Sequence, residues 1–100
     1  VDSQPMWVLR ATNDKTERIL RITPGNPRTV GRGSRSDFVL TGGLISRIHC
    51  RLLITNNELT VQDMNSANGT FVNDQRVSQS HLSSGDRLRL GRLELIVSEE

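Results

Sequence analysis

Three short polar segments of this 100-residue chain contain residue types that can hold a phosphate group or a peptide backbone. The first is Gly31-Arg32, the second spans residues 46–49 and the third spans residues 68–70. Arginine offers parallel N–H donors to two phosphate oxygens, a serine hydroxyl donates to another oxygen, and an asparagine amide both donates and accepts. Each segment therefore has residue types that could hold a phosphate or clamp a peptide backbone.

The stretches between these segments alternate apolar and polar residues, as β-strands do. Short apolar runs between turn signals are typical of sandwiches and barrels, and the sequence shows no convincing long helix and no internal repeat. We therefore expect an all-β fold, a two-sheet antiparallel β-sandwich of about ten or eleven short strands. The expected strands lie at residues 7–10, 19–22, 29–31, 38–40, 50–55, 59–64, 70–72, 75–77, 87–90 and 93–97.

Residues 50–55 show the alternation most clearly, since Cys50, Leu52 and Ile54 are expected to face the core and the residues between them to face outward. Met64 is expected to return on the core side of the next strand. Asparagine and glycine tolerate the backbone angles of tight turns. Turns are expected at residues 13–15, 56–57, 73–74 and 84–86.

Length and composition predict a single domain over residues 1–100, with its core over residues 7–97. The start at Val1 without a methionine indicates a module of a longer protein. Thirteen basic and eleven acidic residues are scattered along the chain, tyrosine is absent and the net charge is +2, which disfavours a nucleic-acid surface. The single cysteine cannot form an internal disulfide, which favours an intracellular protein, and no apolar run has the length of a membrane span.

The order Gly-Arg, Ser-x-x-His and Asn-Gly, with matching strands between, resembles the forkhead-associated (FHA) domain, a module that binds phosphothreonine peptides. The resemblance runs from Trp7 to Val97. It implies that Arg32, preceded by Gly31, binds the phosphate. It also implies that Asn68 holds the ligand main chain just after the phosphothreonine.

Neighbouring residues supply further expected contacts. Ser46 can donate its hydroxyl to a phosphate oxygen, and Arg47 can balance the second negative charge of the phosphate. Ser66 and Ala67 can offer backbone N–H groups. The commoner family pattern has serine or threonine in place of Ala67, so one hydroxyl contact is expected to be missing here.

Two residues are expected to support the binding loops. His49 begins a strand, where an inward ring can hydrogen-bond the loop backbone through one nitrogen, and the resemblance gives it the same role without ligand contact. Gly69 pairs with Asn68 in a turn.

Other site chemistries fit these residues less well. A hydrolase triad of Ser46, His49 and Asp63 lacks the Gly-x-Ser-x-Gly frame that displays a nucleophile. A zinc site of His49, Cys50 and His81 lacks a fourth ligand, and adjacent strand residues point to opposite faces. The Gly-Arg segment lacks the lysine and the helix of a nucleotide phosphate loop. We expect a binding module with no catalytic residue, no metal and no other cofactor.

Leu44 lies two places before Ser46, where some FHA domains carry an arginine that reads an acidic residue three places after the phosphothreonine. We expect Leu44 and Ser66 to belong to a loop that sets specificity, with an aliphatic or undemanding preference at that ligand position.

The expected partner is a phosphothreonine-containing protein segment, bound by a monomeric domain with no nucleic-acid, membrane or metal partner. Self-association through a phosphorylated segment of the parent protein is a second option. The parent is expected to act in kinase signalling, including DNA-damage or checkpoint pathways, and in the nucleus rather than the cytoplasm if it is eukaryotic. The alternative is a phosphate-independent interaction domain of the same fold, which the joint presence of Arg32, Ser46, Arg47 and Asn68 disfavours.

Overall fold

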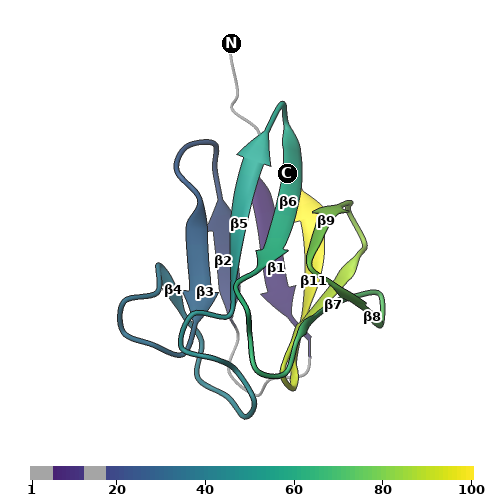
Figure 1. The fold of residues 1–100 in the computed structure, drawn as a ribbon. Helices are drawn as coiled ribbons and strands as arrows, with labels where there is room; N and C mark the ends of the chain where they lie inside the picture. The colour runs from purple at the N-terminus through teal and green to yellow at the C-terminus, as the bar shows by residue number, and fades with distance from the viewer. Residues whose placement is uncertain (1–5, 13–17) are drawn as a thin grey trace.

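Eleven β-strands form two sheets that pack face to face in a computed structural model, which describes residues 6–12 and 18–100 (Figure 1). The turn expected at 13–15 lies outside the described residues. The strands are β1 (Trp7–Ala11), β2 (Ile19–Ile22), β3 (Arg28–Gly31), β4 (Phe38–Val39), β5 (Cys50–Thr55), β6 (Glu58–Asp63), β7 (Thr70–Val72), β8 (Gln75–Val77), β9 (Gln79–Leu82), β10 (Arg87–Leu90) and β11 (Leu93–Glu99).

The larger sheet has the order β2-β1-β11-β10-β7-β8 and the smaller sheet the order β4-β3-β5-β6-β9. The expected sandwich is therefore confirmed, with one exception to its antiparallel pairing: β4 runs parallel to β3, with Val30 opposite Phe38. The loop between them returns the chain to the start of β3. There the Asp37 carboxylate accepts hydrogen bonds from the Thr29 N–H at 2.8 Å and the Thr29 hydroxyl at 3.2 Å.

The core lies between the two sheets and consists mainly of leucine, isoleucine and valine side chains from both. In β5 the predicted alternation is confirmed, because Cys50 and Leu52 are fully buried while Arg51 is half-buried. Burial raises the pKa of the Cys50 thiol, so this group stays protonated and unreactive.

Two features of the fold differ from the sequence expectations. Strand β9 was not expected, because residues 79–82 contain a single apolar side chain, Leu82. The strand forms by pairing with β6, which places Leu82 opposite Leu59. The expectation that Met64 faces the core is wrong. Strand β6 ends one residue earlier, the chain turns at Asn65 with a φ of 57°, and the Met64 side chain is exposed.

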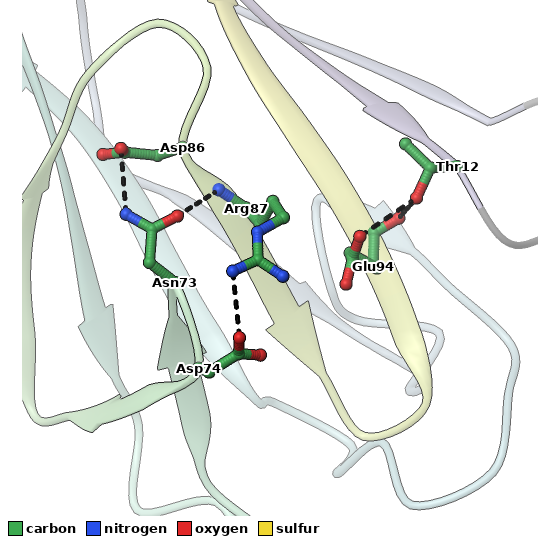
Figure 2. A network of polar contacts seen from close by, with 6 residues as sticks. All are labelled: Thr12, Asn73, Asp74, Asp86, Arg87 and Glu94. Atoms are coloured by element: carbon green, nitrogen blue, oxygen red, sulfur yellow. Dashed lines mark hydrogen bonds and ion pairs between the residues drawn. The ribbon is translucent and has the colours of Figure 1, made fainter.

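Hydrogen bonds from side chains fix the turn of the β7–β8 hairpin to the start of β10 in the same sheet (Figure 2). The amide of Asn73 donates to Asp86 and accepts from the Arg87 N–H, both at 3.0 Å, and Asp74 pairs with the Arg87 guanidinium at 2.9 Å. Asn73 and Asp74 have φ values of 50° and 70°, which confirms the expected turn.

The loops that carry the polar segments meet at one end of the sandwich. The β3–β4 loop (32–37), the β4–β5 loop (40–49) and the β6–β7 loop (64–69) lie at the bottom of Figure 1, opposite the β5–β6 turn. Among the described residues there is no helix long and apolar enough to cross a lipid bilayer.

Candidate functional site

Backbone hydrogen bonds join the β3–β4 loop to the β4–β5 loop. The Arg32 N–H donates to the Ser46 carbonyl, and the Gly33 N–H donates to the Arg47 carbonyl, both at 3.0 Å. The buried hydroxyl of Ser36 donates to the same Arg47 carbonyl at 2.8 Å. The position of Arg47 is therefore set from the neighbouring loop, and Ser36 is a supporting residue that the sequence motifs did not reveal.

The ring of His49 joins the β4–β5 loop to the β6–β7 loop. It is fully buried, its Nδ1 accepts from the Ser46 N–H at 3.1 Å, and its Nε2 lies 2.8 Å from the Gly69 carbonyl. These partners require the neutral tautomer with the proton on Nε2. The sequence suggested a bond through one nitrogen, and the structure places a backbone group at each.

The carboxylate of Asp63 organises the β6–β7 loop from inside. It accepts hydrogen bonds from the N–H and the hydroxyl of Ser66, and from the Thr70 hydroxyl at 2.8 Å. Burial would by itself raise the pKa of Asp63, but the hydrogen bonds from Ser66 and Thr70 outweigh it and hold this pKa below its ordinary value. The spacing of an aspartate three residues before a serine is the local signal that could have revealed this support.

The polar groups of Ser66 are bonded to Asp63 and within the β6–β7 loop. Ser66 is buried, its N–H is donated to Asp63, and its hydroxyl oxygen accepts from the Gly69 N–H at 3.0 Å. The N–H that Ser66 was expected to offer to a ligand is thus engaged by Asp63, and its place in a specificity loop stays a prediction.

Ser46 and Ala67, from different loops, meet directly. The Ala67 N–H donates to the Ser46 hydroxyl oxygen at 3.0 Å. Because this oxygen acts as the acceptor, the hydroxyl hydrogen can be donated to an incoming anion. A phosphate oxygen placed here could take a hydrogen bond from the Ser46 hydroxyl, whose oxygen is held by Ala67.

Arg32 and Arg47 line one open pocket with a volume of about 400 Å³. The residues lining it are Arg32, Gly33, Ser34, Arg35, Arg47 and Ile48, so it contains no carboxylate. Like charges brought this close repel each other, and a phosphate dianion would offset that repulsion. A pocket of similar volume, about 390 Å³, at the other end of the sandwich is lined by Glu58, His81 and Glu99 among others, and does not gather cations.

A further hydrogen bond joins Asn68 of the β6–β7 loop to Leu44 of the β4–β5 loop. The Asn68 side-chain amide donates to the Leu44 carbonyl at 3.2 Å, and Leu44 has a φ of 71° and an exposed side chain. Neither residue lines the arginine pocket, and Ser46 and Ala67 do not line it either. The expected site residues thus form two neighbouring groups, linked through the consecutive residues Ser46 and Arg47.

The geometry does not assemble a hydrolase triad. Both ring nitrogens of His49 face backbone groups of Ser46 and Gly69, while the Asp63 carboxylate binds Ser66 and Thr70. Within residues 6–12 and 18–100, no three His, Cys, Asp or Glu side chains are grouped so that they could hold a metal ion.

Residues 28–91 match the family model described as FHA domain. The chain is 37% identical over 68 residues to the glycogen accumulation regulator GarA of Mycobacterium tuberculosis, covering 68% of this chain and 42% of that protein. It is 34% identical over 85 residues to the FHA domain-containing protein FhaA of the same organism, covering 85% of this chain and 16% of that protein. The chain thus spans less than half the length of either relative.

Solved structures share the fold. One comes from a structural and functional analysis of phosphothreonine-dependent FHA domain interactions, with a TM-score of 0.84 and 33% identity over 92% of this chain and 94% of that chain. Another is the FhaA FHA domain complexed with the intracellular domain of Rv3910, also with a TM-score of 0.84 and 33% identity, covering 92% of this chain and 99% of that chain.

Proposed function

Because the chain belongs to the FHA domain family, we propose that it binds a phosphothreonine-containing segment of a partner protein and so brings its parent protein to kinase-marked partners. The observation that supports this most strongly is the pocket in which Arg32 and Arg47 face one space that no carboxylate lines. Two arginines on loops that are hydrogen-bonded to each other match a phosphate that carries nearly two negative charges.

The proposed roles follow the two groups of residues. Arg32 and Arg47 bind the phosphate from the pocket, and Ser46 donates its hydroxyl from the adjoining position. Ala67 supports this contact through its N–H, which donates to the Ser46 oxygen, and it lacks the hydroxyl of the commoner pattern. Asn68 holds the ligand main chain just after the phosphothreonine.

Three residues in the proposal act by holding the loops. Gly31 lets β3 approach the β4–β5 loop, His49 joins that loop to the β6–β7 loop, and Gly69 supplies the carbonyl that His49 contacts, with a φ of 92°. None of them is proposed to touch the ligand.

The proposal is a binding module with no catalysis, acting as a monomer inside the cell. The relatives support the binding role, since GarA is named a regulator and FhaA is named for its FHA domain. Both relatives are bacterial, so they give no support to a nuclear location or a DNA-damage pathway, and these remain predictions.

The test is calorimetric titration with a degenerate phosphothreonine peptide library and the matching unphosphorylated library. Phosphorylated peptides should bind, unphosphorylated ones should not, and Arg32→Ala should lose about 2 to 5 kcal/mol of binding free energy, as when one partner of a desolvated charge pair is truncated. Arg21→Ala, an exposed arginine on β2 of the other sheet, is the control and should bind normally. Equal binding of both libraries would favour the phosphate-independent alternative.

A further inference from the structure

A third arginine shares the pocket of Arg32 and Arg47. Arg35 is exposed and lines the same pocket of about 400 Å³. It lies in a tight turn closed by the Ser36 N–H, which donates to the Gly33 carbonyl at 3.0 Å. Because Gly33 and Ser36 also bind the Arg47 carbonyl, the turn that displays Arg35 is fixed to the β4–β5 loop.

The positive charges that line this pocket outnumber the negative charges of a single phosphate. Three arginines line a pocket that is proposed to hold a group with at most about two negative charges. The nearest carboxylate in sequence, Asp37, accepts hydrogen bonds from Thr29 on β3 and does not line the pocket. No ion pair joins Arg32, Arg35 or Arg47 to an acidic side chain of the described part of the chain. One positive charge is therefore left for a second acidic group.

We propose that Arg35 reads a carboxylate on the ligand, on the N-terminal side of the phosphothreonine. This rests on the proposed function, in which Asn68 holds the main chain after the phosphothreonine. The turn of Arg35 is bonded to the Arg47 carbonyl, whereas Asn68 is bonded to Leu44 further back in the same loop. We therefore place Arg35 before the phosphothreonine and Asn68 after it along the peptide.

The test uses calorimetric titration of the chain with a phosphothreonine peptide that has alanine at three positions on each side. Six further peptides each replace one of these alanines by glutamate. Glutamate at one of the preceding positions should tighten binding about three- to fivefold, the size of one partly exposed ion pair, and high salt should reduce this gain. Glutamate at the following positions should give no such gain.

Two variants assign the gain to its residue. Arg35→Gln should bring the ratio of Kd values for the alanine and glutamate peptides to about one, the result that a double-mutant cycle gives when the partner is removed. Arg21→Gln makes the same charge change on the other sheet and should keep the wild-type ratio. Because Arg35 is exposed in a turn, its variant should melt like the wild type.

The outcomes separate this inference from the function on which it rests. Two results overturn the role of Arg35 and leave the proposed function standing. One is phosphate-dependent binding with no gain from glutamate at any preceding position, and the other is a gain that persists in Arg35→Gln. Failure of every phosphopeptide to bind overturns the proposed function and this inference with it.

Discussion

The carbonyl oxygen of Arg47 lies in the space that a side chain on Gly31 would need. A Cβ built on Gly31 would be 2.1 Å from this oxygen and 2.8 Å from the Ser46 carbonyl oxygen. Both obstacles are backbone atoms that accept hydrogen bonds from the β3–β4 loop, so they cannot move away without breaking those bonds. Gly31 is therefore needed for the close approach of two loops, and the need does not come from an unusual backbone angle.

Gly31→Ala should destabilise the fold and weaken phosphopeptide binding together. Overpacking of this kind costs about 1 to 3 kcal/mol, and 1 kcal/mol lowers the melting temperature of a domain of this size by about 4 to 8 °C. Thermal unfolding and calorimetry measure the two effects. Gly43→Ala is the control, since its nearest obstacle is the Arg92 Cδ at 3.9 Å. A Gly31→Ala variant with normal stability would show that the loops separate at no cost.

His49→Ala should lower the melting temperature and the affinity in the same variant. Removal of the ring leaves the Ser46 N–H and the Gly69 carbonyl without their partner, at about 1 to 3 kcal/mol for each buried group. Differential scanning calorimetry and peptide titration check the two results. Loss of binding with unchanged stability would mean that His49 contacts the ligand and is not a loop support.

Asp63 should make stability depend on pH below neutrality. Its pKa is below its ordinary value in the folded state, despite the opposing effect of burial, because of the hydrogen bonds from Ser66 and Thr70. Its contribution to the free energy of unfolding is therefore fully present above the unfolded pKa of about 3.9, and is lost as pH falls through the lower folded pKa. In urea at neutral pH, the free energy of unfolding of Asp63→Asn should be lower than that of the wild type. The difference between the two should become smaller below about pH 4.

A surface carboxylate is the control for that titration. Asp74→Asn removes an exposed ion pair with Arg87 at 2.9 Å and should change stability little at any pH, because exposed pairs contribute about 0 to 1 kcal/mol. The assigned role of the Asp63 carboxylate would be contradicted if Asp63→Asn and the wild type differed in free energy of unfolding by the same amount at neutral and acidic pH.

Most of the fold could be predicted because the strands carry their own pattern. The β5–β6 turn is an example, since Asn56 and Asn57 have φ values of 53° and 65°, which asparagine tolerates. Strand β9 could not be predicted, since its polar sequence becomes a strand through pairing with β6 and not through a local preference. Met64 was misplaced because periodicity does not show where a strand ends.

The candidate site divides in the same way. Arg32, Arg47 and Asn68 stand out by residue type, since few side chains can bind a phosphate or a peptide main chain. The residues that hold the loops do not stand out, because a serine such as Ser66 can hydrogen-bond either a ligand or its own loop. Here the position of Asp63 shows that Ser66 bonds its own loop. The orientation of each polar group is set by tertiary contacts that the sequence pattern does not encode.

Leu44 should favour an aliphatic residue three places after the phosphothreonine. Its side chain is 50% exposed, and its carbonyl accepts a hydrogen bond from Asn68, which is proposed to hold the main chain leading to that residue. A cation also lies close to Asn68, because the Arg76 side chain packs against the next residue, Gly69. Its Nε would be 2.8 Å from a Cβ built on Gly69. Each buried methylene contributes about 0.8 kcal/mol, whereas an exposed ion pair contributes about 0.2 to 1 kcal/mol, so isoleucine should outweigh aspartate.

Peptides that differ only in isoleucine, alanine or aspartate at that position show whether Leu44 or Arg76 sets the preference. Isoleucine should bind severalfold more tightly than alanine, and Leu44→Ala should remove most of this difference while Arg76→Gln leaves it unchanged. The aspartate peptide should bind no better than the alanine peptide, because Arg76 remains in water and its attraction is screened by salt. If aspartate binds most tightly and Arg76→Gln abolishes its advantage, the guanidinium reads the position and the role assigned to Leu44 is wrong.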